Sequence, residues 1–205
     1  MNKSEIIPVF PLSGAFLLPS GNLPLNIFEP RYVDMVDYAF KKNKLIGMIQ
    51  PKNQNSTELF KIGCIGKITS FSETQDKRYL INLYGLSRFK IIKEVQNEKK
   101  FKTFEIKSLK KSVVYHNLDD KLFNKELFIN KIEIYLKIIG LQVNIDSLKE
   151  IDSQSLITMV AMLCPFSPNE KQLLLEAENI TNLLKTLNSL VDFMINNKTK
   201  NESIN

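Results

Sequence analysis

Apolar and polar residues alternate in short runs along the first half of the chain, which is the pattern of half-buried β-strands. Turn-forming residues separate the runs, most clearly at residues 19–22, Pro-Ser-Gly-Asn, and in the polar segment 73–77. The expected strands are residues 6–10, 15–18, 23–28, 45–50, 62–70, 79–84, 88–95 and 101–109. This half therefore predicts two long β-hairpins around a small barrel.

One helix is expected between these strands. It would start at Pro30, because proline is tolerated in the first turn of a helix. Five apolar residues then share one helical face: Tyr32, Met35, Val36, Ala39 and Phe40. The lysine-rich run at residues 41–44 places positive charge at the negative end of this helix. We expect the helix to close one end of the barrel.

The periodicity changes after Val114, where a polar linker at residues 116–120 is followed by helical spacing. An amphipathic helix is expected at residues 121–139, ended by Gly140, and another at residues 153–163. The change predicts two subdomains. They are a β subdomain at residues 1–115 and a helical subdomain at residues 116–205.

The last two helices carry clear local signals. Ser167 and Glu170 form a capping box, with Pro168 as the first helical residue. The final apolar stripe consists of Ile180, Leu183, Leu184, Leu187, Leu190, Val191 and Met194. We interpret it as the core seam of a helical bundle, in preference to a surface that binds a partner. The polar tail from Asn196, about residues 197–205, is expected to be disordered.

Charge is unevenly distributed along the chain. Residues 1–115 carry a formal net charge of +9 and residues 116–205 carry −3. A basic half attracts nucleic acid, acidic proteins or a membrane surface through its field, although solvated surface lysines are the favoured explanation. The candidate nucleic-acid face consists of Lys99, Lys100, Lys102, Lys107, Lys110 and Lys111.

The sequence offers little for catalysis. Its single histidine, His116, falls in the polar linker, where no neighbours would orient it. Phosphate-binding glycine motifs are absent, and Cys64 and Cys164 lack the spacing of a zinc site. No catalytic residues, metal site or cofactor are therefore predicted. Without a convincing signal peptide or a membrane-spanning segment, the expected location is the cytoplasm.

Several motifs resemble one known family. They are Phe-Pro-Leu at residues 10–12, Leu-Leu-Pro-Ser-Gly at 17–21, and Leu-Pro-Leu-Asn-Ile-Phe-Glu-Pro-Arg-Tyr at 23–32, with further matches at residues 63–66, 84–89 and 161–175. Together they resemble the substrate-binding domain of Lon proteases. The resemblance implies an α+β fold, a PUA-like β pseudo-barrel with one inserted helix followed by a helical bundle. It also implies binding rather than chemistry, because the ATPase and peptidase modules have no counterpart here.

The shared motifs supply the candidate binding residues, which are Pro24, Phe28, Glu29, Arg31, Tyr32, Gly85 and Arg88. Their interpretation stays open between holding the fold and contacting a ligand. In the first case Phe28 packs inward, Arg31 pairs with Glu29 or reaches back to carbonyls of the barrel, and Gly85 permits a turn or bulge before Arg88.

Three functions follow as hypotheses. The first is a non-enzymatic module that holds unfolded or client proteins, or a protein partner, at the barrel rim, an exposed strand edge or the seam between barrel and helices. The second is an RNA-binding module that uses the basic half. The third, a hydrolase hidden in a crevice, lacks a visible set of catalytic residues.

Overall fold

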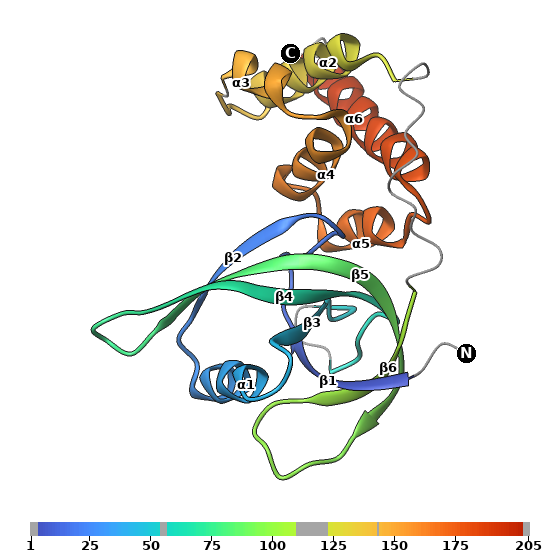
Figure 1. Cartoon of the computed structure of the whole chain (residues 1–205). Coiled ribbons are helices and arrows are strands. Elements are labelled where there is room, and N and C mark those ends of the chain that lie inside the picture. The colour runs from blue at the N-terminus through green and yellow to red at the C-terminus, as the bar shows by residue number, and fades with distance from the viewer. Residues whose placement is uncertain (1–3, 54–56, 110–122, 143, 203–205) are drawn as a thin grey trace.

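The computed structural model describes residues 4–53, 57–109, 123–142 and 144–202. The strands gather in a barrel, and the helices α2–α6 lie together on one side of it, with α4 and α5 nearest (Figure 1). Helix α1 lies on the opposite side of the barrel. The predicted α+β fold is therefore confirmed, whereas the expected boundary at residues 115 and 116 lies outside the described residues.

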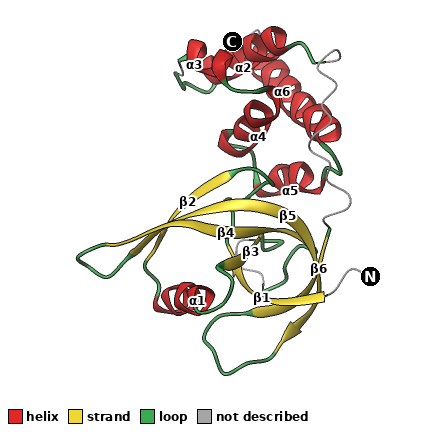
Figure 2. Cartoon of the chain, in the orientation of Figure 1, coloured by secondary structure: helices red, strands yellow, loops and turns green. Residues whose placement is uncertain are grey.

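Six strands form one mixed sheet, drawn in yellow in Figure 2. They are β1 (Ser4–Pro11), β2 (Asn22–Ile27), β3 (Leu45–Ile49), β4 (Ile62–Glu73), β5 (Tyr79–Val95) and β6 (Thr103–Ser108). Their order is β2-β5-β4-β3-β1-β6, and β6 pairs with β5 to close the barrel. Along one edge of β5, residues 79–84 pair with β2 and residues 89–95 pair with β6. Strand β2 therefore has a single neighbour in the sheet.

Two expectations for the strands were wrong. Residues 79–84 and 88–95 belong to one continuous strand, because a register shift between the pairs Gly66–Gly85 and Ile65–Ser87 accommodates one extra residue in β5. Residues 15–18 are not a strand. Phe16, Leu17 and Leu18 are instead buried in a loop, so the apolar run reflects burial without strand pairing.

The inserted helix is confirmed as α1 (Pro30–Phe40), with proline in its first turn. Tyr32, Met35, Val36 and Ala39 are buried and join the main core. Phe40 is only partly buried, and its ring meets that of Phe71 edge-on at 5.0 Å.

Five further helices follow: α2 (Lys125–Ile138), α3 (Ile145–Glu150), α4 (Ser153–Leu163), α5 (Pro168–Glu176) and α6 (Ile180–Glu202). The capping box of α5 is present, since the Ser167 and Glu170 side chains bond each other's backbone N–H groups. Short α3 was not expected. Helix α6 continues to Glu202, and the expected disorder from about residue 197 stays a prediction.

One main hydrophobic core runs through the barrel and the helices. It includes Met35 and Leu83 of the barrel half together with Leu156, Leu183 and Leu187 of the helices. The stripe of α6 therefore serves as a core seam, as predicted, because Ile180, Leu183, Leu187 and Val191 are buried. Among the described helices, none is long and apolar enough to cross a membrane.

Candidate binding site between the barrel and the helices

The candidate residues around α1 fall into two groups. Tyr32 is buried, and its ring lies 4.2 Å from that of Phe10, so it belongs to the core. Arg31 pairs with Glu29 at 2.8 Å on the surface, which is the first of its two expected contacts. The expectation that Phe28 packs inward was wrong. Its side chain is 64% exposed directly after β2, because the strand ends at buried Ile27 and the chain turns into α1.

Arg88 is a buried structural residue. It is 3% exposed and lies on β5. Its guanidinium donates hydrogen bonds to the carbonyl oxygens of Glu176 at 2.9 Å and Glu178 at 3.3 Å. These carbonyls lie at and just beyond the end of α5, where the helix dipole favours a positive charge. Arg88 therefore fastens α5 to the barrel.

A pair of buried glutamines reinforces this contact. Gln172 of α5 donates from Nε2 to the carbonyl oxygen of Ile62 at 3.1 Å. Gln50 donates to the carbonyl of Pro168 at 3.1 Å and to Oε1 of Gln172 at 3.2 Å. Buried polar groups that are hydrogen-bonded fix a geometry, because breaking them leaves desolvated groups unpaired. We call the contacts of Arg88 and Gln50 with α5, together with that of Gln172 of α5 with Ile62, the α5 contact.

Gly85 permits a close approach of two backbone segments. A Cβ atom at this position would lie 2.0 Å from the carbonyl oxygen of Leu18. The two backbone segments are also hydrogen-bonded to each other. Ser20 N–H donates to the carbonyl of Gly85, and Gly85 N–H donates to the carbonyl of Gly21. Gly85 thus holds the turn at residues 19–22 against β5 through its lack of a side chain.

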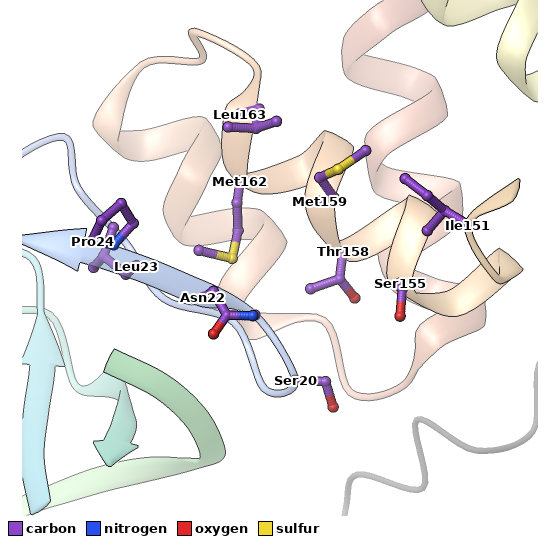
Figure 3. A pocket seen from close by; sticks show the side chains of 11 residues that line it. Ser20, Asn22, Leu23, Pro24, Ile151, Ser155, Thr158, Met159, Met162 and Leu163 are labelled. Carbon is purple, nitrogen blue, oxygen red and sulfur yellow. The ribbon is translucent and has the colours of Figure 1, made fainter. Parts of the chain in front are cut away.

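That turn, together with β2, forms one wall of a cavity of about 550 Å³, and α4 forms most of the other (Figure 3). The lining residues are Ser20, Gly21, Asn22, Leu23, Pro24, Ile151, Ser155, Thr158, Met159, Met162 and Leu163. None of them is charged. Met162 points from α4 toward β2, and its sulfur lies so close to Gly21 that a Cβ there would be 2.3 Å away. Leu163 is 72% exposed at the cavity margin. We call this space the seam cavity.

Thr158 gives the seam cavity an unusual polar group. The residue is 2% exposed, and its hydroxyl has no hydrogen-bond partner among the residues that the structure describes. An unpaired buried hydroxyl costs about 1–3 kcal/mol relative to a paired one. A bound molecule that offered an acceptor or donor here would therefore gain from it.

The comparisons with known proteins place the chain in a family. Residues 6–192 match the family described as the ATP-dependent protease La (LON) substrate-binding domain. The chain belongs to this LON family. It is 30% identical to a Lon protease of Cytophaga hutchinsonii over 106 residues, 48% of this chain and 13% of that protein. It is 25% identical to Lon protease 1 of Borreliella burgdorferi over 209 residues, 93% of this chain and 26% of that protein.

Solved structures agree on the fold. A Lon N-terminal domain protein from Xanthomonas campestris matches with a TM-score of 0.64 at 19% identity, over 90% of this chain and 98% of that one. The N-terminal domain of a Mycobacterium avium complex Lon protease matches with a TM-score of 0.61 at 15% identity, over 93% and 98%. The chain therefore spans about a quarter or less of the two Lon proteases above, and nearly all of these two solved chains.

Of the seven residues predicted from the LON motif, only Pro24 lines the seam cavity. Arg88, Gly85 and Tyr32 instead shape the structure around it. Sequence reasoning missed the wall contributed by α4. A signal was present, because Met159, Met162 and Leu163 make α4 more apolar than one buried helical face requires.

The predicted lysine face is interrupted by carboxylates. Lys99, Lys100 and Lys102 do share one loop, and Lys99 Nζ lies 4.4 Å from the centre of the Tyr38 ring. However, Lys102 pairs with Glu94 at 3.1 Å. The hollow beside Lys99 and Lys100 is also lined by acidic side chains, namely Asp34, Asp37 and Glu98. Lys107 lies on β6, whereas Lys110, Lys111 and His116 lie outside the described residues.

The thiols of this LON family member are poor nucleophiles. Burial raises the pKa of Cys164 to about 12 and raises the pKa of Cys64 even further. Because the thiolate is the reactive form, neither residue has the environment of a catalytic cysteine. Within the described residues there is also no group of three or more His, Cys, Asp or Glu side chains that could hold a metal.

Proposed function

We propose that the chain is a non-catalytic recognition module that holds unfolded segments of other proteins in the seam cavity. The observation that carries this proposal is a cavity of about 550 Å³ lined by eleven residues without a charge, in a domain of the LON substrate-binding family. Protein pockets that bind ligands commonly enclose about 300–1,000 Å³. The cavity thus has room for large apolar side chains of a client.

The chemistry of the lining favours varied apolar clients. Met159 and Met162 are unbranched and polarizable, so they adapt to side chains of different shape. Burying one leucine or phenylalanine side chain contributes about 1.5–3 kcal/mol. One such contact is weak, which suits a module that must capture and release many sequences.

The direct test is binding of reduced, carboxymethylated lactalbumin, an unfolded protein, measured by fluorescence anisotropy. Leu163→Glu places a charge at the cavity margin and is expected to weaken binding about tenfold or more, which corresponds to roughly 1.4 kcal/mol. Leu173→Glu is the matched control, because Leu173 is also an exposed leucine, at 57%, but lies on α5 away from the lining. Equal effects of the two substitutions, or no binding by the unchanged chain, would contradict the proposal.

RNA binding by the basic half is the alternative, and it has less support because carboxylates interrupt the lysine face. It requires an affinity that falls linearly with salt in a log-log plot. A labelled single-stranded RNA titrated at several salt concentrations measures this slope. Tight RNA binding with a steep slope, together with no binding of the unfolded protein, would reverse the order of the two proposals.

A further inference from the structure

Strand β2 has a free edge whose backbone groups can be assigned. Gly85 N–H donates to the carbonyl of Gly21, so this pair is hydrogen-bonded. Hydrogen-bonded and non-hydrogen-bonded pairs alternate along an antiparallel ladder. The backbone N–H and C=O groups of Leu23, Leu25 and Ile27 therefore point toward β5. The backbone groups of Asn22, Pro24 and Asn26 consequently face away from β5. They offer three carbonyl acceptors but only two N–H donors, because proline has none.

The free edge opens onto the seam cavity. The sheet order ends at β2, so no further strand of the described chain pairs with it. Figure 1 shows β2 between β5 and the helices, and Figure 3 shows Asn22 and Pro24 facing the space next to Met162 of α4. The groups of one strand edge and an uncharged apolar wall therefore border the same space.

We infer that this edge binds an extended, uncharged peptide segment as an additional β-strand, with an apolar side chain of that peptide in the seam cavity. This inference rests on the proposed function and specifies how the client segment binds. A peptide backbone supplies the donors and acceptors that the edge of β2 lacks, which is how strand addition gains affinity. The hydroxyl of Thr158 then meets a polar group of the peptide.

Complementarity of charge defines the occupant further. Asn22, Pro24 and Asn26 on the edge are neutral, as are the residues of the seam cavity. The bound stretch is therefore uncharged, since a buried charge without a partner is strongly unfavourable.

A second copy of the chain fits the edge poorly. If two β2 strands paired about a two-fold axis centred on Pro24, the two prolines would face each other, and neither could donate. Proline on an edge strand is also a common protection against pairing between identical chains. An external peptide has N–H groups at every position except its own prolines, so it can bond the Pro24 carbonyl.

The decisive experiment is a scan of backbone N-methylation. Overlapping 12-residue peptides that cover the lactalbumin sequence are first ranked for binding to the full chain. The tightest peptide is then methylated at one backbone nitrogen at a time. We expect losses of about tenfold at every second residue and small effects between them, because only alternate N–H groups face β2.

The outcomes separate the inference from the proposed function. A scan without period two, on a peptide that binds, overturns strand addition and leaves the recognition module standing. Failure of both the unfolded protein and every peptide to bind overturns both. A chain that dimerises in sedimentation velocity, and whose dimer neither binds the peptide nor is dissociated by it, has its edge occupied by a second copy, which also overturns the inference.

Substitutions in the chain test the assignment of the β2 edge independently of the peptide scan. Pro24→Ala adds the missing donor and is expected to tighten peptide binding about 3–10-fold. Pro168→Ala, at the first turn of α5, is the matched control and leaves the affinity unchanged. An unchanged affinity of Pro24→Ala contradicts the assignment of the edge.

The two unpartnered hydroxyls provide a second matched pair. Thr158→Val and Tyr135→Phe each remove a buried hydroxyl that has no partner among the described residues, and only Thr158 lines the seam cavity. Thr158→Val is expected to weaken peptide binding about 3–10-fold, and Tyr135→Phe is expected to leave it unchanged. Equal effects of the two would show that the Thr158 hydroxyl does not meet the peptide.

Discussion

Two of the places where the described helices meet the barrel differ in chemistry. At the α5 contact, Arg88, Gln50 and Gln172 are each 3% exposed or less and bond across the interface. At the seam cavity, α4 faces β2 across an uncharged space, and the buried hydroxyl of Thr158 has no partner among the described residues. The first contact is specific and closed, while the second leaves apolar and polar groups available. One interface thus combines a fixed attachment with the cavity that we propose as the binding site.

The difference has an energetic origin. A buried guanidinium is stable only while carbonyls surround it, so the α5 contact must form as a unit. Methionine side chains are flexible, so they adopt other conformations at little cost in free energy. We therefore expect substitutions at the α5 contact to change stability, and substitutions at the seam cavity to change binding.

Among these substitutions, Arg88→Ala should cause the largest loss in the free energy of unfolding. It leaves the carbonyls of Glu176 and Glu178 without their donor, and each buried acceptor that loses its partner costs up to about 1–3 kcal/mol. Urea unfolding followed by circular dichroism measures the loss. Arg31→Ala is the control, because its surface ion pair with Glu29 contributes about 1 kcal/mol or less. Similar losses for the two arginines would refute the structural role of Arg88.

Gly85→Ala should come next and should affect both stability and binding. Its Cβ would lie 2.0 Å from the Leu18 carbonyl, so the turn that forms one cavity wall has to move. Overpacking of this kind costs about 1–3 kcal/mol. We also expect weaker binding of the unfolded probe. Gly140→Ala is informative beside it, because Gly140 has a positive φ of 76° in open space. That variant should lose stability through backbone strain while keeping its affinity.

Gln172→Ala should change stability alone, with a loss of about 1–3 kcal/mol, because Gln50 and the carbonyl of Ile62 each lose a hydrogen-bond partner. Its affinity for the unfolded probe, measured by anisotropy on the folded variant, should stay within about twofold of the unchanged chain, well under 1 kcal/mol. A marked loss of affinity would show that the two regions are not independent.

Local signals in the sequence predicted the elements well where the chemistry is local. The capping box at Ser167 and the proline at Pro30 depend only on near neighbours, and both helices begin where expected. The strand at residues 79–95 was divided wrongly, because Gly85 marks a bulge as readily as a turn. Six-residue α3 is too short to show helical periodicity.

The candidate site was harder to predict because it joins distant parts of the chain. Met162 and Gly21 are far apart in sequence, and no periodicity reports their contact. Arg88 was taken as a possible ligand contact because it belongs to a motif shared with the family, and only the fold reveals the carbonyls around it. The motif around Pro24 did indicate one wall of the seam cavity.

The smallest effect at neutral pH is expected for Tyr135→Phe, which provides a reference away from both regions. Tyr135 of α2 stacks on Phe166 with ring centres 6.1 Å apart. Burial raises its pKa to about 12, above the ordinary value of 10.0. The folded form therefore resists ionisation more than the unfolded chain does, and this stability is complete below pH 10 and lost as the pH rises toward 12. Urea unfolding at several pH values should show a shallower alkaline loss in Tyr135→Phe. An identical slope in both chains would mean that the hydroxyl is solvated in the folded state.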